Sequence, residues 1–333
     1  MEDWTPARLM QLSGSYWGAC ALHAAVKLDV FSALGRKIMG AELLAENLGA
    51  DERALSMLLD ACAALGLVVK TGETYGNSPF ALKHLCKSSP DYLGYILLHH
   101  HYLVSAWRSL DFSVVSGGPL RQGGGDGDPL QREAFLMGMF NMANLIAPRL
   151  VPQIDLEGRT RLLDLGGGPG TWAFHFCRHN PALEALVFDL PTTEPFEQQC
   201  AQRFGMEDRV RFQAGDFLKD EIEGRFDVAW LSHILHGENS ERCRFLLKKA
   251  ARSLEPGGLL LIHEFILDDS GASPLFPALF SLNMLLNTEG GRSYREGELR
   301  QMLEEAGFTD IRRLAQEIPG ESSVMAAALP KRS

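Results

Sequence analysis

The spacing of apolar residues changes near residue 150. Before that point leucines recur at helical spacing, as in Leu55, Leu58 and Leu59, and this period indicates amphipathic helices. After it, short apolar runs alternate with amphipathic stretches, which is typical of parallel strands joined by helices. The pattern therefore predicts a helical N-terminal region followed by an α/β region.

Seven apolar segments beyond residue 150 predict the strands of a seven-stranded sheet. They are residues 161–165, 183–190, 210–216, 226–235, 259–267, 311–318 and 324–329. Helical stretches separate the first five, so we expect a doubly wound, mostly parallel α/β sheet. The last two segments would form a closing pair of strands.

The N-terminal pattern of two short helices followed by a hairpin predicts a winged-helix unit over residues 30–85. A winged helix can bind DNA, and a transcriptional regulator is therefore one alternative. However, the second helix begins with Asp51 and Glu52 and carries Asp60, whereas a recognition helix needs basic or amide side chains. The net charge of −10 also disfavours a nucleic-acid partner.

Glycine-rich sequence between residues 113 and 130 predicts a flexible surface loop, and the apolar segment 135–140 after it predicts a buried helix. We accordingly divide the chain into three parts. We expect residues 1–112 to form a helical domain with the winged-helix unit, 113–150 a loop and linking helix, and 151–333 the sheet domain.

Composition places the chain among ordinary globular proteins, with 46% hydrophobic and 22% charged residues. The six cysteines are scattered and form no C-x-x-C pair. We therefore expect neither a metal site nor a disulfide scaffold, and a cytoplasmic location. The N-terminus lacks the pattern of a signal peptide, and no run of eighteen apolar residues predicts a membrane span.

The first strand of the sheet runs into the turn Asp164-Leu165-Gly166-Gly167-Gly168-Pro169-Gly170. Glycine lets backbone N–H groups approach a ligand closely, and open α/β sheets bind ligands beyond the carboxyl ends of their strands. Asp189 ends the second strand, where an acid can bind ribose hydroxyls. A dinucleotide motif would need a third glycine where this chain has Thr171, so an NAD-dependent oxidoreductase is the weaker alternative.

Three ordered segments, residues 162–170, 187–191 and 215–217, resemble the cofactor motifs of class I methyltransferases. Together with the helical N-terminal region, they resemble the dimeric small-molecule O-methyltransferases, which include the caffeic acid, acetylserotonin and bacterial antibiotic-tailoring enzymes. The resemblance covers essentially the whole chain. It implies a Rossmann-like fold, S-adenosylmethionine as cofactor, and a homodimer.

The resemblance also implies a set of cofactor-binding residues. Gly166 and Gly168 would face the amino-acid part of S-adenosylmethionine, and Asp189 would bind its ribose. Asp216 would bond the adenine amine, and Phe217 would stack on the adenine ring. The full expected set is Asp164, Gly166, Gly168, Asp189, Leu190, Gly215, Asp216, Phe217 and Ser232.

The segment that begins Ile234-Leu235-His236-Gly237 resembles the catalytic segment of the same family, which implies that His236 is a general base. Histidine suits this task because its unperturbed pKa is about 6.5. Glu264 matches one of two family glutamates and would orient the imidazole. We interpret His233, earlier on the strand, as structural.

The chain departs from the family at two positions, with Ser293 in place of the second glutamate and Gly237 in place of an aspartate. Both departures fit carbon methylation of a tetrapyrrole or another ring system, which stays an alternative to O-methylation. A protein that binds S-adenosylmethionine without transferring methyl is another alternative.

By the same resemblance, four residues match substrate-pocket positions. They are Phe135, Met139, Asn283 and Met284. The amide of Asn283 on an apolar helix suits a polar substrate group. We expect the acceptor to be a hydroxylated aromatic or polyketide-like small molecule, and no membrane partner.

Overall fold

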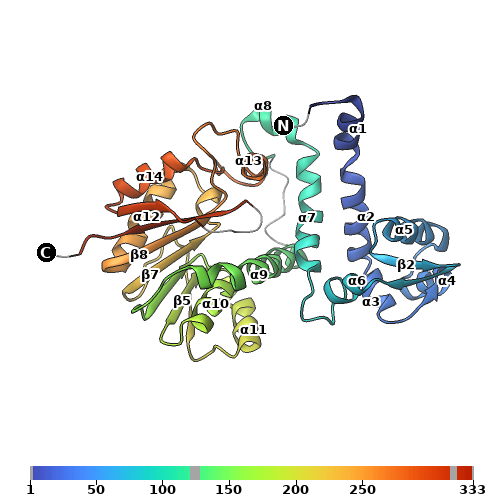
Figure 1. Ribbon diagram of the computed structural model, residues 1–333, viewed down its shortest axis with the longest axis horizontal. Helices are drawn as coiled ribbons and strands as arrows, with labels where there is room; N and C mark the ends of the chain where they lie inside the picture. The colour runs from blue at the N-terminus through green and yellow to red at the C-terminus, as the bar shows by residue number, and fades with distance from the viewer. Residues whose placement is uncertain (1–2, 121–127, 316–320, 332–333) are drawn as a thin grey trace. The chain divides into compact units, whose positions relative to one another are not determined.

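The structure, a computed structural model, describes residues 3–120, 128–315 and 321–331 (Figure 1). These residues form two compact units. The described residues within Met1–Val104 and Asp126–Asn141 make the first, and those within Ser105–Gly125 and Met142–Ser333 make the second. The boundaries at residues 112 and 150 expected from the sequence stay predictions.

The first unit consists of helices around a small antiparallel sheet with the order β1-β3-β2. The predicted helix pair and hairpin are confirmed, and β1 is an additional strand. Asp51 is the N-cap of α5, where its Oδ1 accepts the N–H of Ala54 at 2.8 Å. The elements are α1 (Pro6–Gly14), α2 (Tyr16–Lys27), α3 (Val30–Leu34), β1 (Met39–Gly40), α4 (Ala41–Leu48), α5 (Glu52–Ala64), β2 (Val68–Thr71), β3 (Thr74–Asn77), α6 (Pro79–His84) and α7 (Gly94–Trp107).

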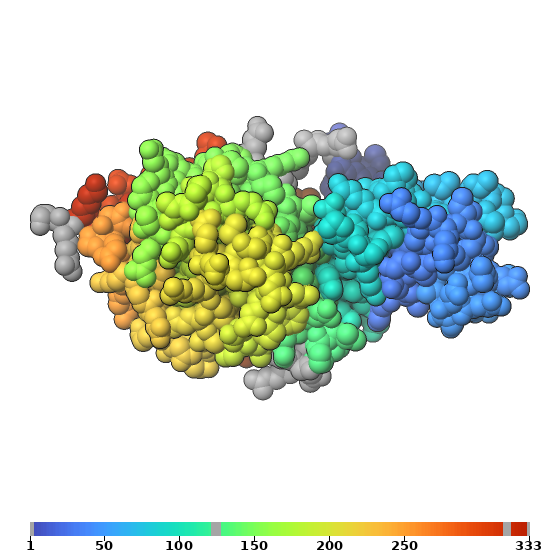
Figure 2. All heavy atoms as spheres, turned by 90° about the horizontal axis from the view of Figure 1, so that it is seen from below, coloured from blue at the N-terminus to red at the C-terminus, as the bar shows by residue number. Residues whose placement is uncertain are grey.

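The second unit is an α/β domain built on one seven-stranded sheet, as predicted. In the view of Figure 2, much of the visible surface of this unit is coloured green to yellow, the colours of residues that include α10 and α11. Its elements are α8 (Leu110–Ser116), η1 (Val151–Gln153), β4 (Arg161–Leu165), α10 (Thr171–His179), β5 (Glu184–Asp189), η2 (Pro191–Thr193), α11 (Glu194–Phe204), β6 (Val210–Ala214), β7 (Phe226–Ser232), η3 (Leu235–Gly237), α12 (Ser240–Ser253), β8 (Leu254–Glu264), α13 (Leu275–Asn287), α14 (Glu296–Glu305), β9 (Thr309–Arg313) and β10 (Ser323–Ala328).

The strand order of this sheet is β6-β5-β4-β7-β8-β10-β9. Strands β4 to β8 pair in parallel, whereas β10 pairs antiparallel with both β8 and β9. The order reverses between β4 and β7. In sheets of this kind the carboxyl ends of the strands at the reversal border a ligand-binding crevice, and the residues after β4, β7 and β8 therefore define the candidate site.

Some predicted boundaries were wrong. Residues 113–116 belong to helix α8 and residues 129–130 to the next helix, rather than to a loop. Residues 121–127 of the glycine-rich stretch lie outside the described residues, as do residues 316–318 of the sixth predicted strand. Strand β7 ends at Ser232 rather than at residue 235, because His233 adopts a positive φ of 58° that breaks the extended backbone.

Helix α9 (Pro129–Leu150) confirms the predicted helix around residues 135–140. With the η1 turn that follows, it forms the one described segment, Pro129–Gln153, that is long and apolar enough to cross a membrane. However, 61% of its apolar window is buried inside the protein, as is usual for a core helix of a globular protein.

Candidate active site

The glycine turn after β4 brings backbone close to two neighbouring segments. Gly168 has a φ of 56°, and its N–H donates to Oδ2 of Asp189 at 2.8 Å, which ties the turn to the end of β5. A Cβ atom at Gly166 would lie 2.4 Å from Cδ1 of Ile234, and one at Gly167 would lie 2.6 Å from Cγ of Asp164. The inner side of the turn therefore has room for backbone only.

Two carboxylates, Asp164 and Asp189, border this turn, and burial raises the pKa of both. Asp164 is fully buried, its Oδ2 accepts the N–H of Ala173 at 3.2 Å, and its Oδ1 has no partner among the described residues. Burial raises the pKa of Asp164 to about 7. Burial also raises the pKa of Asp189, although backbone N–H groups of Gly168 and Leu190 bond its carboxylate.

The segment after β6 lies beside the same turn. The N–H of Gly215 donates to the carbonyl of Asp189 at 2.8 Å, and a Cβ at Gly166 would lie 3.7 Å from the ring of Phe217. Asp216 forms an ion pair with Lys219 at 2.7 Å, and this bond holds the pKa of Asp216 below its ordinary value. The fold thus brings the expected cofactor residues after β4, β5 and β6 together.

Beyond β7 and β8, His236 and Glu264 form a close pair. Nδ1 of His236 lies 2.7 Å from Oε2 of Glu264, and the backbone N–H of His236 donates to Oε1 at 3.3 Å. The side chains are 13% and 5% exposed. Burial alone would raise the pKa of Glu264, but the neighbouring imidazoles His236 and His233 hold it well below its ordinary value.

The loop that carries His236 is fixed by two hydrogen bonds from farther along the chain. The hydroxyl of Tyr294 donates to the carbonyl of Glu238 at 2.6 Å, and the thiol of Cys243 donates to the carbonyl of Leu235 at 3.2 Å. Both bonds are made to backbone carbonyl groups of the loop. The loop therefore holds His236 in place in addition to the contact of its ring with Glu264.

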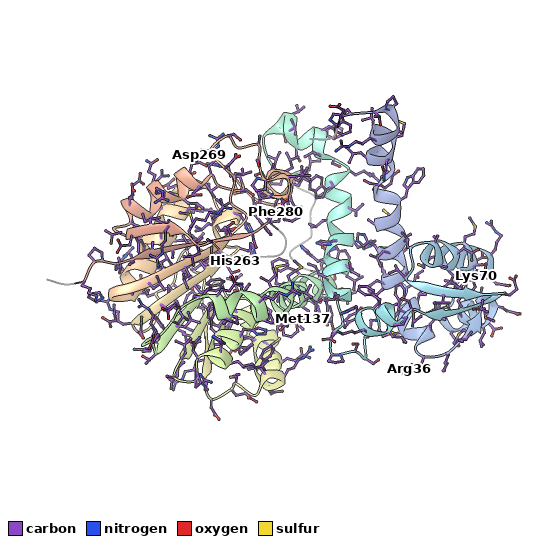
Figure 3. The ribbon with its side chains drawn as sticks, viewed as in Figure 1. Arg36, Lys70, Met137, His263, Asp269 and Phe280 are labelled. Atoms are coloured by element: carbon purple, nitrogen blue, oxygen red, sulfur yellow. The ribbon has the colours of Figure 1, made fainter. Side chains whose placement is uncertain are left out.

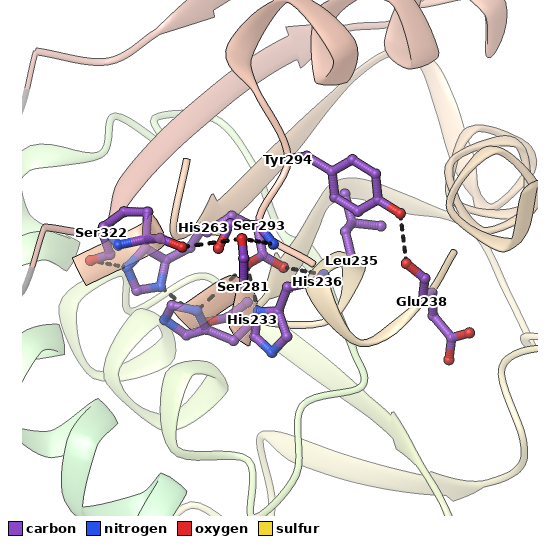
Figure 4. A network of polar contacts seen from close by, with 12 residues as sticks. His233, Leu235, His236, Glu238, His263, Ser281, Ser293, Tyr294 and Ser322 are labelled. Atoms are coloured by element: carbon purple, nitrogen blue, oxygen red, sulfur yellow. Dashed lines mark hydrogen bonds and ion pairs between the residues drawn. The ribbon is translucent and has the colours of Figure 1, made fainter. Parts of the chain in front are cut away.

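A second polar chain lies next to this pair, and Figure 4 shows it in the same network. His263 bonds Ser232 through Nδ1 and Ser322 through Nε2, each at 2.9 Å. Burial lowers the pKa of His263 well below its ordinary value, so its ring is neutral. The hydroxyl of Ser232, expected to contact the cofactor, is bonded to His263 in this structure.

Three phenylalanine rings that were not predicted from the sequence form a cluster beside His236. The Phe280 ring lies edge-on to His236, with centroids 4.8 Å apart. Phe265 packs on Phe280 at 4.6 Å and on Phe276 at 4.8 Å. Figure 3 shows Phe280 on α13 and His263 at the end of the sheet. No local motif marks these rings, although Phe265 directly follows Glu264.

The four expected pocket residues occupy different surroundings. Asn283 lies on α13, and its Oδ1 accepts a hydrogen bond from the indole N–H of Trp107 at 3.0 Å. Met284, next to it, is buried. Phe135 and Met139 lie in the first compact unit, where Phe135 packs on His99 at 5.3 Å. Their contact with a substrate stays a prediction.

The site also contains a group that could hold a metal ion, which the sequence did not predict. One ligand atom from each of His233, His236 and Glu264 lies within 4.8 Å of the others. The 2.7 Å separation of His236 and Glu264 is that of a direct hydrogen bond. The pair is therefore complete as a histidine–carboxylate dyad.

Comparison with known proteins identifies both parts of the chain. Residues 110–309 match the O-methyltransferase domain family, and residues 10–87 match the O-methyltransferase dimerisation domain family. The chain is 36% identical over 321 residues to the tetracenomycin polyketide synthesis 8-O-methyl transferase TcmO of Streptomyces glaucescens, with 94% of each chain covered.

One further relative and one solved structure are also similar to this chain. The 3-hydroxy-5-methyl-1-naphthoate 3-O-methyltransferase of Streptomyces sahachiroi is 32% identical, over 96% of this chain and 94% of its own. The crystal structure of human N-acetylserotonin methyltransferase in complex with S-adenosylmethionine superposes with a TM-score of 0.88, 24% identity and 99% of both chains covered, which shows the shared fold. The chain belongs to the S-adenosylmethionine-dependent O-methyltransferases that carry an N-terminal dimerisation domain.

Proposed function

We propose that this protein methylates a hydroxyl group of a planar aromatic, polyketide-like small molecule, with His236 as the general base. The observation that carries this proposal is the 2.7 Å hydrogen bond between Nδ1 of His236 and the buried carboxylate of Glu264. A carboxylate on Nδ1 fixes the tautomer of the ring and leaves Nε2 as the nitrogen that accepts a proton.

The residues at the ends of β4, β5 and β6 suit the cofactor. When bound, S-adenosylmethionine would supply a methyl group on a positively charged sulfur, and this sulfur is the leaving group when an acceptor oxygen bonds the methyl carbon. Its amino-acid part would lie on the Gly166–Gly168 turn, where a Cβ at Gly166 or Gly167 would meet neighbouring side chains, and the unpartnered Oδ1 of Asp164 suits a cationic group. Asp189 would bind the ribose, and Asp216 and Phe217 the adenine.

The task of this chain's own residues is to hold the acceptor and to take its proton. Nε2 of His236 would accept the hydroxyl proton as the oxygen becomes nucleophilic. The resulting imidazolium would lie against the Glu264 carboxylate, whose lowered pKa keeps it charged. Positioning the acceptor next to the base supplies much of the remaining rate enhancement.

The rings of Phe265, Phe276 and Phe280 favour a flat aromatic acceptor. They form a continuous apolar surface next to His236, and aromatic rings prefer offset or edge-on partners at such distances. The names of two relatives, a polyketide methyltransferase and a naphthoate methyltransferase, support the same class of acceptor.

Mass spectrometry of products tests this function directly. The purified protein is incubated with S-adenosylmethionine and a panel of hydroxynaphthoates and hydroxyanthraquinones, and NMR of each product distinguishes methyl ethers from carbon-methylated rings. His236→Ala should lower product formation at least about 100-fold and leave cofactor affinity within about twofold. His179→Ala, at an exposed position on α10, is the control. Full activity of His236→Ala would disprove the general base.

We also propose a homodimer in the cytoplasm. Helix α1 has no buried residue, and Met10, Tyr16 and Trp17 are more than half exposed although apolar, which suits a protein interface. All six cysteines are free thiols, which suits a reducing compartment. Light scattering that gives the 36.7 kDa mass of one chain would contradict the dimer.

A further inference from the structure

Two histidines, not one, face the same carboxylate oxygen. Oε2 of Glu264 lies 2.7 Å from Nδ1 of His236 and 3.7 Å from Nδ1 of His233. Figure 4 shows both imidazoles in one network. The carboxylate of Glu264 is buried, and a buried charge is tolerated only when donors satisfy its oxygens. His233 supplies the second imidazole nitrogen within reach of Oε2.

The backbone of His233 is held in an uncommon conformation that aims its ring at this carboxylate. Its φ of 58° lies in the left-handed region, which residues other than glycine rarely adopt. Such conformations persist where the surroundings fix them, and they cluster at functional sites. Here the N–H of His233 donates to the carbonyl of His263 at 2.9 Å.

The ring of His233 is also confined by its neighbours. Phe265 and His263 each pack against it with centroids 4.4 Å apart. Both nitrogens of His263 are already bonded, to Ser232 and Ser322, so His263 cannot serve Glu264. By contrast, Nδ1 of His233 is buried and has no hydrogen-bond partner among the described residues.

The titratable groups that face His233 are Glu264 and His263 on β8 and His236 on η3. Burial lowers the pKa of His233, so its ring is neutral near pH 7. A neutral imidazole can still donate one N–H. The 3.7 Å separation is longer than a hydrogen bond, and contacts of this kind in ligand-free sites often shorten when ligands bind.

We propose that His233 is a positioning residue for the dyad, whose Nδ1–H is the second donor to Oε2 of Glu264 and fixes this oxygen against His236. The proposal rests on the proposed function of His236. It replaces the structural interpretation of His233 and gives the Glu264 carboxylate a neutral donor in addition to His236. Such a donor holds the carboxylate in place without adding charge.

NMR of the whole protein tests the proposal without any acceptor. Histidine labelled with ¹⁵N, in protein saturated with S-adenosylhomocysteine at pH 7, reports the tautomer of each ring, with His233→Asn used to assign the signals. We expect the proton of His233 on Nδ1. A bare Nδ1 with the proton on Nε2, or an imidazolium at pH 7, would overturn the proposal even if His236 proved to be the base.

Two substitutions at His233 then separate donation from packing. His233→Gly removes the ring without backbone strain, since glycine adopts positive φ freely. His233→Asn also tolerates this conformation and places an amide N–H on Cγ, where Nδ1 is attached. With the acceptor found in the product assay, we expect kcat of His233→Gly to fall roughly 10- to 30-fold, with KM for the cofactor unchanged.

His233→Asn should restore most of the lost kcat, and free imidazole should partly rescue His233→Gly. Equal losses in both variants would indicate packing alone and would overturn the proposal. If no acceptor is methylated at all, the proposed function fails, whereas the NMR tautomer still decides the role of His233.

Discussion

Asp164 and Glu264 are buried carboxylates at the carboxyl ends of parallel strands, β4 and β8, yet their acidities move in opposite directions. Asp164 receives one backbone N–H, its Oδ1 has no partner among the described residues, and burial raises its pKa to about 7. Glu264 receives a backbone N–H and faces two imidazoles, which hold its pKa below the ordinary value.

For Asp164 and Glu264, which are both buried, the neighbouring groups decide the direction of the pKa shift, because Glu264 faces imidazoles and Asp164 does not. The carboxyl ends of β4, β5 and β6, the cofactor edge, include Asp164, whose carboxylate has one oxygen without a partner among the described residues, and such an oxygen suits a cationic ligand. The carboxyl ends of β7 and β8, the acceptor edge, include Glu264, whose carboxylate is already hydrogen-bonded to His236, as an acid–base pair requires. Three substitutions test this contrast.

The largest effect is expected from Glu264→Gln. The amide keeps the shape of the side chain but cannot hold the negative charge that stabilises a protonated His236. We expect kcat to fall about 100- to 1000-fold, with cofactor affinity from calorimetry unchanged within about twofold. Asp164→Asn is the matched variant, and it should affect cofactor affinity more than kcat. An unchanged kcat in Glu264→Gln would remove the dyad from the reaction.

The second-largest effect is a pH dependence of the free energy of unfolding that arises from Asp164. With its raised pKa, Asp164 retains a proton in the folded protein that the unfolded chain releases near pH 4. The free energy of unfolding therefore falls as pH rises from about 4 to about 7, by on the order of 3 kcal/mol. Asp164→Asn should reduce this fall, and Glu197, whose pKa burial also raises to about 7, would keep part of it. Urea unfolding of the cofactor-free protein at pH 5 and pH 8 would measure the difference.

The contribution of Glu264 to the free energy of unfolding changes with pH in the opposite direction. Because its pKa is lowered on folding, its contribution is present above about pH 4 and is lost only as pH falls through the lowered value. A pH dependence in Asp164→Asn equal to that of the natural protein would assign the change between pH 5 and pH 8 to other groups.

The smallest effect is expected from Phe280→Leu, which tests the acceptor edge without changing the cofactor edge. Leucine keeps the surface apolar but loses the edge-on contact with His236 and the contact with Phe265. We expect KM for the aromatic acceptor to rise about 3- to 10-fold, which corresponds to about 1 kcal/mol, with little change in kcat. Phe80→Leu, exposed on α6, is the control, and equal effects in both variants would contradict a role for Phe280.

The cofactor edge could be predicted from sequence because its parts are short and contiguous. Gly166, Gly168 and Asp189 each follow or end an apolar strand, and the sheet brings those strand ends together. The strands themselves were predicted within about five residues. Strand β8 begins at Leu254 rather than at residue 259, and His233 ends β7 early. Such local signals need no knowledge of distant contacts.

The acceptor edge could be predicted only in part. His236 and Glu264 were identified by resemblance, but their distance depends on the pairing of β7 with β8. The rings of Phe276 and Phe280 lie on α13. On this helix we predicted Asn283 and Met284 as pocket residues and did not predict the two rings. The partner of Asn283, Trp107, lies 176 positions away, and no periodicity reveals a contact of that kind.

Strand β10 has a consequence for how the protein is made. It is the last strand that the structure describes, yet it lies between β8 and β9. While the ribosome is still making the chain, β8 therefore has an apolar edge without its partner until β10 emerges. Such edges pair readily with other chains. In the nascent protein the edge of β8 consequently stays open to pairing with other chains until β10 has been made.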